Sequence, residues 1–106
     1  MQGENPYKAS PGPQTDRAIH RHYFVSDGTV LPYSTDDEAA FKLRARIKVV
    51  YGYPVQVGET KTRPRQYFAR FESGPSTATE VLAETLPLAI CRLGLVIALT
   101  RDPATN

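Results

Sequence analysis

The stretch that most constrains the fold is Thr85–Leu99, which has the sequence TLPLAICRLGLVIAL and carries one charge, Arg92. Its apolar part is about fourteen residues long, whereas a helix that spans a bilayer needs about 20. Pro87 would break a helix arriving from upstream but is tolerated in a first turn. The sequence therefore predicts a buried helix from Leu86 to around Thr100, with Thr85 as its N-cap.

Composition places few further limits on the chain. Its 106 residues correspond to one domain with a single modest core. A formal charge of +2 is too small to indicate nucleic-acid binding by itself. The first residues have no apolar core of a secretory signal, so we expect a cytoplasmic protein that does not enter a membrane. The single cysteine, Cys91, excludes an internal disulfide and is expected to pack as a small apolar side chain.

Proline and glycine dominate the beginning of the chain, where no periodic pattern appears. Residues 1–18 are therefore expected to form a flexible arm, and residues 19–102 a single domain. The segment His20–Ser26, HRHYFVS, is rich in aromatic and β-branched residues and is followed by a turn signal. These features predict a first strand.

A helix is expected to begin after Thr35, because Thr35 and Glu38 have the spacing of a capping box. Its body is ambiguous, since apolar residues from Phe41 to Val49 alternate with basic ones as they would in a strand. The cap signal and a stripe at Ala40, Leu43, Ile47 and Val50 favour a helix that ends near Gly52.

Two further segments, Tyr53–Val57 and Arg65–Glu72, have strand character and are separated by a polar turn, which predicts a hairpin. Thr77 and Glu80 repeat the capping-box spacing, so a short helical stretch is expected through about Glu84. Together these elements predict an α+β fold: a small antiparallel sheet of His20–Ser26, Tyr53–Val57 and Arg65–Glu72, with helices packed on it.

Two motifs resemble a known family. Pro32–Asp36 (PYSTD) with Ala39–Phe41 (AAF) is similar to one element of the phage ABA sandwich domain family, although the family has tryptophan where Phe41 stands. Pro87–Arg92 (PLAICR) is similar to its closing helix, and Gln66–Phe71 lies where the family has a strand. The resemblance covers residues 32 to 100 and implies a phage or prophage protein with helices on both sheet faces. Phe68 would then be buried, and an exposed sheet face would contradict this arrangement.

Candidate chemistry is sparse. His20 and His22 would share one face of a strand and could hold a metal ion, but no third ligand is recognisable, so solvated histidines are expected. Cys91 lies among apolar residues, where packing is expected rather than nucleophilic chemistry. Adjacent carboxylates at Asp36–Glu38 do not share a helix face and are explained by capping. We therefore expect no catalytic residues, no cofactor and no enzymatic activity.

A basic and aromatic cluster is the best candidate for a ligand site. On the predicted hairpin, cations beside aromatic rings could bind phosphates, nucleic acid or another anionic ligand. The alternative is a solvated sheet edge whose charges discourage unwanted strand pairing. The cluster consists of Lys61, Arg63, Arg65, Tyr67 and Arg70.

The last helix is apolar on nearly every side, which indicates either a second covering layer or a protein partner. We expect self-association as a homodimer, with Leu88, Arg92, Leu95 and Leu99 at the interface, unless a flanking helix and the arm cover this helix. The resulting hypothesis is a non-enzymatic phage accessory protein that binds a macromolecular partner, such as a host defence component. Binding of nucleic acid or an anionic nucleotide-like ligand and a minor structural role in the virion are the alternatives.

Overall fold

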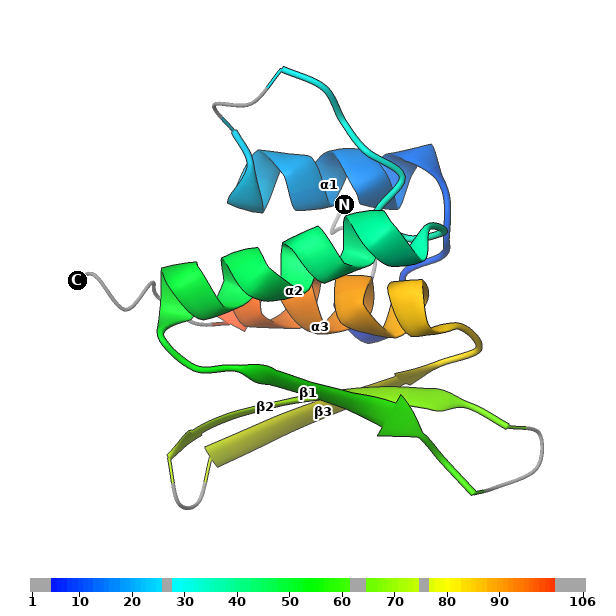
Figure 1. Cartoon of the computed structure of the whole chain (residues 1–106), viewed down its shortest axis with the longest axis vertical. Helices are drawn as coiled ribbons and strands as arrows, with labels where there is room; N and C mark the ends of the chain where they lie inside the picture. The colour runs from blue at the N-terminus through cyan, green and yellow to red at the C-terminus, as the bar shows by residue number, and fades with distance from the viewer. Residues whose placement is uncertain (1–4, 26–27, 62–64, 75–76, 101–106) are drawn as a thin grey trace.

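The structure, a computed structural model, describes residues 5–25, 28–61, 65–74 and 77–100. Within these ranges the chain forms three α-helices and a three-stranded antiparallel sheet (Figure 1). The predicted α+β class is therefore confirmed. In chain order the elements are η1 (Pro6–Lys8), α1 (Pro13–Tyr23), α2 (Asp37–Tyr51), β1 (Val55–Glu59), β2 (Tyr67–Gly74), β3 (Thr77–Ala83) and α3 (Leu86–Thr100).

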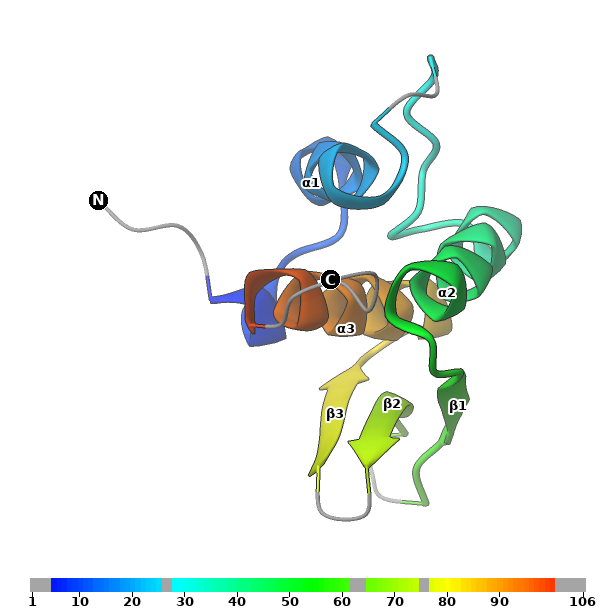
Figure 2. The same cartoon turned by 90° about the vertical axis from the view of Figure 1, so that its left-hand side faces the viewer.

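The sheet is a meander in the order β1-β2-β3, and all three α-helices lie on one side of it (Figures 1 and 2). Side chains alternate between its two faces, as the pleat of a strand requires. The face toward the helices is apolar and buried, and it carries Val55, Ala69, Phe71, Val81 and Ala83.

No helix among the described residues covers the opposite face, so the predicted three-layer sandwich is wrong. That face carries Arg70, Glu80 and Leu82, and 44% of Leu82 is exposed. Phe68 is half-buried without a second helical layer, because its ring lies over Gly58 on the neighbouring strand. A Cβ atom added at Gly58 would come within 2.6 Å of that ring.

Helix α3 is the centre of the molecule and contacts every other element. It lies between the sheet and α1, with α2 beside it (Figure 2). Its predicted start is confirmed, because the Leu88 amide donates to Thr85 Oγ1 at 3.3 Å. Leu88, Ile90 and Ile97 are almost fully buried, and burying each such side chain stabilises the fold by about 2 kcal/mol.

The strand predicted at His20–Ser26 is wrong, because most of this segment belongs to α1. Asp16, Ile19 and Tyr23 recur at helical spacing and are all buried, so one stripe of α1 faces the core. Pro13 sits in the first turn, where it costs no hydrogen bond. This helical burial outweighs the β-propensity of the aromatic residues that follow.

Residues 5–18, which we expected to form part of a flexible arm, pack against the domain. Ala9 is 2% exposed, and its carbonyl accepts a hydrogen bond from Arg92 Nε at 2.9 Å. Thr15 and Asp16 are buried at the beginning of α1. For residues 5–18 the arm prediction fails because α1 already begins at Pro13 and the proline-rich segment before it is held by tertiary contacts.

The predicted helical stretch from Thr77 is also wrong, and β3 occupies this segment. Val81 and Ala83 are buried while Glu80 and Leu82 are exposed, which is the alternation of a strand. Glu80 lies opposite Arg70 of β2 instead of closing a capping box.

Helix α2 is confirmed, but its cap differs from the prediction. Asp36, rather than Thr35, accepts the amide of Ala39 at 2.9 Å. Gly52 ends the helix in the left-handed region, with φ of 87°. The predicted hairpin is confirmed as well, with both strands two residues further along the chain than expected.

Candidate functional site

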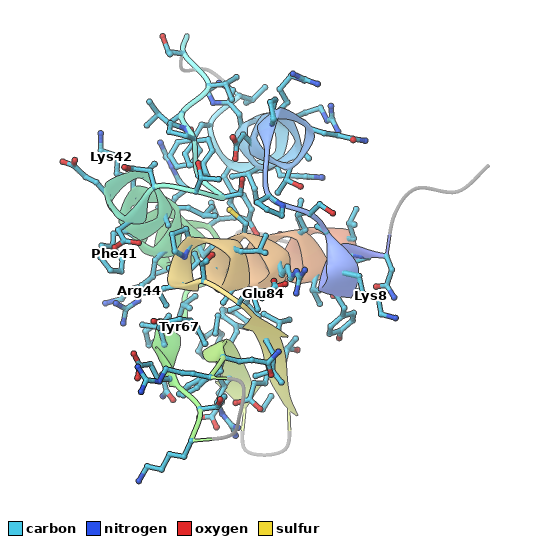
Figure 3. All side chains as sticks on the ribbon, turned by 90° about the vertical axis from the view of Figure 1, so that its right-hand side faces the viewer. Lys8, Phe41, Lys42, Arg44, Tyr67 and Glu84 are labelled. Atoms are coloured by element: carbon cyan, nitrogen blue, oxygen red, sulfur yellow. The ribbon has the colours of Figure 1, made fainter. Side chains whose placement is uncertain are left out.

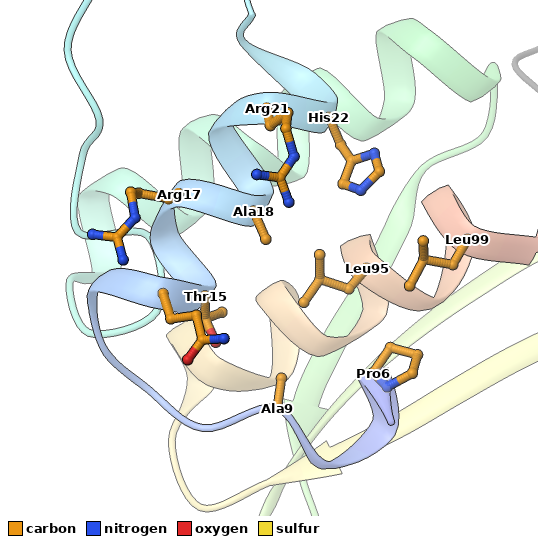
Figure 4. Close-up of a pocket in the computed structure, with 10 residues that line it drawn as sticks. Pro6, Ala9, Thr15, Arg17, Ala18, Arg21, His22, Leu95 and Leu99 are labelled. Carbon is orange, nitrogen blue, oxygen red and sulfur yellow. The ribbon is translucent and has the colours of Figure 1, made fainter. Parts of the chain in front are cut away.

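A groove of about 330 Å³ runs between α1 and α3 and is bounded below by η1 (Figure 4). We call it the basic groove. One wall comes from α1 and carries Arg17, Arg21 and His22. The opposite wall comes from α3 and carries Leu95 and Leu99.

Small side chains give the basic groove its depth. Ala18 lies between the arginines of α1, while Pro6 and Ala9 close the side formed by η1 (Figure 4). At one end lies Thr15, whose hydroxyl donates to the Ser10 carbonyl at 2.5 Å and is therefore already engaged.

The orientation of α1 determines which residues face the groove. Ile19 and Tyr23 dock on α3 near Gly94, and the Tyr23 hydroxyl donates to the Gly94 carbonyl at 2.6 Å. The absence of a side chain at Gly94 permits this approach, since an added Cβ would lie only 3.3 Å from Ile19 Cδ1. With this stripe facing inward, Arg17 and Arg21 lie exposed, one helical turn apart.

A buried carboxylate fixes the N-terminal end of α1. Asp16 Oδ1 accepts hydrogen bonds from the Ser34 amide at 2.8 Å and from the Ser34 hydroxyl at 2.6 Å. The amide of Gly12 in turn donates to Ser34 Oγ at 2.9 Å. These contacts tie α1 to the loop before α2 and engage the carboxylate of Asp16 inside the fold.

The α1 wall is consequently positive. Among the described residues, no carboxylate forms an ion pair with Arg17 or Arg21. Burial lowers the pKa of His22, and the neighbouring charge of Arg21 lowers it further. Arg21 and His22 point from α1 toward the leucines of α3 (Figure 4).

The α3 wall is apolar and partly uncovered. Leu95 is 7% exposed and forms the deeper part of this wall, whereas 58% of Leu99 remains exposed at the rim. Cations that form no ion pair within the described residues, opposite exposed apolar surface, are a combination suited to binding an anionic partner with an apolar side.

Two other hollows are weaker candidates for a site that binds an anionic partner. One of about 390 Å³ lies between α2 and β1, where Arg44 Nε already donates to the Val55 carbonyl at 2.8 Å. The other, of about 460 Å³, is lined by the carboxylates of Asp37 and Glu84 and by no cation.

The structure does not bring the predicted basic and aromatic cluster together. Arg65 faces Glu59 at 3.7 Å, and Arg70 forms a short ion pair with Glu72 at 2.6 Å, so both charges are compensated. Tyr67 packs toward the core beneath α2, on the face opposite to Arg70 (Figure 3). Lys61 is exposed in the turn after β1, and Arg63 lies outside the described residues.

The four residues predicted at an interface have different environments. Leu88 is 2% exposed and belongs to the core. Arg92 bridges two backbone segments, donating to the carbonyls of Ala9 and Leu82, both at 2.9 Å. Leu95 and Leu99 line the basic groove. Because α1 and η1 cover much of α3, its apolar character no longer argues for a second copy, and self-association stays a prediction for light scattering to test.

The two histidines considered as metal ligands lie on α1, and the single cysteine lies on α3. On a helix, His20 and His22 point in different directions, and His20 Nδ1 lies 3.2 Å from the Tyr33 hydroxyl. No cluster of three metal-ligating side chains occurs in the described part of the chain. Cys91 is fully buried.

Sequence reasoning missed the α1 wall because it assigned His20–Ser26 to a strand and residues 1–18 to an arm. A usable signal was present: Asp16, Ile19 and Tyr23 have helical spacing, and Arg17 and Arg21 fall on another side of the same helix.

Comparisons with known sequences and families found no match. No protein-family model matches the chain, and no curated protein sequence matches it. The resemblance to the ABA sandwich family is thus not confirmed. Within the described ranges, none of the helices has the length and apolar character needed to cross a bilayer.

One solved structure matches across nearly the whole chain. It is the crystal structure of a phage protein from Bacillus cereus, with a TM-score of 0.67 and 20% sequence identity. The match covers 96% of this chain and 94% of that one. At this identity the likeness shows that the two chains share a fold, and that fold occurs in a phage protein.

Proposed function

We propose that this chain is a small, non-enzymatic phage or prophage accessory protein that works by binding a protein partner in the basic groove. The observation that carries the proposal is the pair Arg17 and Arg21, which line the groove on the wall opposite Leu95 and the exposed Leu99 and form no ion pair with any carboxylate of the described residues.

The physical reasoning concerns both affinity and recognition. Burying Leu99 and the rim of Leu95 against a partner would supply apolar contact area. Arginine is enriched at protein interfaces and pairs well with carboxylates. Uncompensated positive charge also speeds encounter with an acidic surface and selects against basic ones. The groove therefore fits a partner that is both acidic and apolar.

The phage assignment rests on fold analogy alone, which is a weaker kind of support than the site itself. A component of a host defence system is the class of partner that such an accessory protein would bind. Neither statement depends on the other, since the groove would serve any partner with the required chemistry.

A pair of matched double variants tests the proposal. The full chain, tagged and purified, is used to capture partners from a lysate of the host bacterium. We expect R17Q/R21Q to reduce the captured amount of a specific protein about tenfold, because two ion pairs are lost. The captured protein is then purified, and its affinities for the wild type and for R17Q/R21Q are measured by calorimetry.

The control is R65Q/R70Q, which removes the exposed Arg65 and the half-buried Arg70, whose charges are compensated by Glu59 and Glu72. It should leave capture unchanged. Equal capture by the wild type and R17Q/R21Q would refute binding in the groove. Loss of capture in R65Q/R70Q instead would favour a binding site on the hairpin. Nucleic acid captured by the wild type but not by R65Q/R70Q would support the anionic-ligand alternative.

A further inference from the structure

We infer that the occupant of the basic groove is an acidic amphipathic α-helix presented by the partner protein. This inference rests on the proposed function and specifies the chemistry and shape of the partner segment. It follows from the spacing of the side chains along both walls of the groove.

Each wall repeats once per helical turn. Arg17 and Arg21 are four positions apart on α1, and Leu95 and Leu99 are four positions apart on α3. On a helix, residues at this spacing lie on the same side, separated by about 6 Å along the axis. An α-helix lying in the groove would meet matching repeats on both of its flanks.

The chemistry of the two walls then fixes the two flanks of the occupant. The flank toward α1 needs carboxylates one turn apart to pair with the arginines. The flank toward α3 needs leucine-like side chains at three- and four-residue spacing to pack on Leu95 and Leu99. Between the walls the groove is lined by the small side chains of Ala9 and Ala18.

Other occupants fit less well. An extended peptide gains affinity from backbone hydrogen bonds to a sheet edge, whereas both main walls here are helices whose interior backbone groups are already paired. A small inorganic anion would leave the exposed part of Leu99 unused. A nucleic acid would meet leucines where it needs further cations, and among the described residues that line the groove only the His22 ring could stack on a base.

Synthetic peptides test the inference directly. The probe is a capped, fluorescently labelled peptide of about 18 residues, long enough to form a helix, with leucines at three- and four-residue spacing and glutamates on one flank. A second, control peptide has lysine in place of every glutamate. Anisotropy titrations with the full chain at low salt should show the glutamate peptide binding at least about tenfold more tightly.

A charge swap provides the decisive variant. R17E/R21E should lose affinity for the glutamate peptide by about tenfold or more and should gain affinity for the lysine peptide. Leu99→Asn should lower the affinity for the glutamate peptide severalfold, and the glutamate peptide should still bind more tightly than the lysine peptide. The substituted side chains are all exposed, and circular dichroism is used to check that each variant is folded.

The outcomes separate this inference from the proposed function. If capture of the natural partner depends on Arg17 and Arg21 but the glutamate peptide does not bind, the helix assignment is overturned and the groove keeps its binding role. Equal affinity for both peptides, or displacement of the glutamate peptide by a single-stranded oligonucleotide, also overturns it. Peptide binding with the predicted charge swap, but no arginine-dependent capture, supports the helix and refutes the proposed natural function.

Discussion

At the scale of single residues, the buried carboxylate of Asp16 joins parts of the chain that are far apart in sequence. It accepts two hydrogen bonds from Ser34, eighteen positions away, and thereby holds α1 against the loop before α2. Hydrogen bonds to a charged acceptor contribute about 1.5–3 kcal/mol each, more than those between neutral groups. The position of the basic wall consequently depends on a residue that does not face the groove.

Asp16→Ala should lower the free energy of unfolding by about 3 kcal/mol, because it leaves the buried amide of Ser34 without its acceptor. Urea denaturation followed by circular dichroism measures the change. Glu84→Ala is the control, since Glu84 is exposed and its removal should alter stability by less than about 0.5 kcal/mol. Similar effects of the two substitutions would contradict the structural role of Asp16.

The thiol of Cys91 should be inert in the folded protein. Burial raises its pKa, and the carboxylate of Asp16 raises it further, so the reactive thiolate is scarce at pH 8. A colorimetric disulfide reagent should therefore react with Cys91 slowly in buffer and rapidly in concentrated urea. Fast stoichiometric reaction without urea would show that the core around α3 opens more readily than its packing indicates.

At the scale of elements, the beginning of α2 illustrates how two adjacent cap candidates are resolved. Both Thr35 and Asp36 can cap a helix, and the sequence spacing favoured Thr35. In the structure the Asp36 carboxylate accepts the Ala39 amide, while Thr35 is exposed.

Asp36→Ala should therefore destabilise the protein by about 1 kcal/mol, the usual cost of losing an N-cap. Thr35→Ala should change the free energy of unfolding by less than about 0.5 kcal/mol. Thermal unfolding of the two variants side by side measures the difference. A larger effect at Thr35 would restore the capping box that the spacing suggested.

Helices α2 and α3 could be predicted because their local signals agree with their burial. Caps, apolar stripes and the glycine at position 52 all pointed to the same elements. Helix α1 and strand β3 could not, because their local signals contradict their tertiary environment. Aromatic residues near His20 favour a strand, yet Ile19 and Tyr23 are needed on one helical stripe to cover α3.

At the scale of the whole molecule, the chain is built in layers on one side of an open sheet (Figures 1 and 2). The outermost layer is α1, which covers α3 around Gly94. The basic groove could not be predicted from sequence because it exists only between this layer and α3. Leu95 and Leu99 of its apolar wall were predicted only as residues of a homodimer interface, and its charged wall depends on the helical geometry of α1.

Deletion of residues 1–23 tests whether this outer layer is part of the fold. The shortened chain should lose cooperative thermal unfolding and form oligomers, because the apolar side of α3 beneath α1 becomes exposed. Size-exclusion chromatography and circular dichroism measure both effects, with deletion of residues 1–4 as the control. A monomeric, cooperatively folding chain after the larger deletion would show that the first segment is dispensable for the core.

The central place of α3 also bears on how the protein is made. Ribosomes synthesise chains from the N-terminus, so η1, α1, α2 and the sheet are translated before the helix on which all of them pack. Contacts such as that between Ala9 and Arg92, 83 positions apart, can form only after α3 has emerged. Until then the nascent chain displays the apolar faces of several elements at once, and it should be a client for chaperones that bind exposed apolar segments during translation.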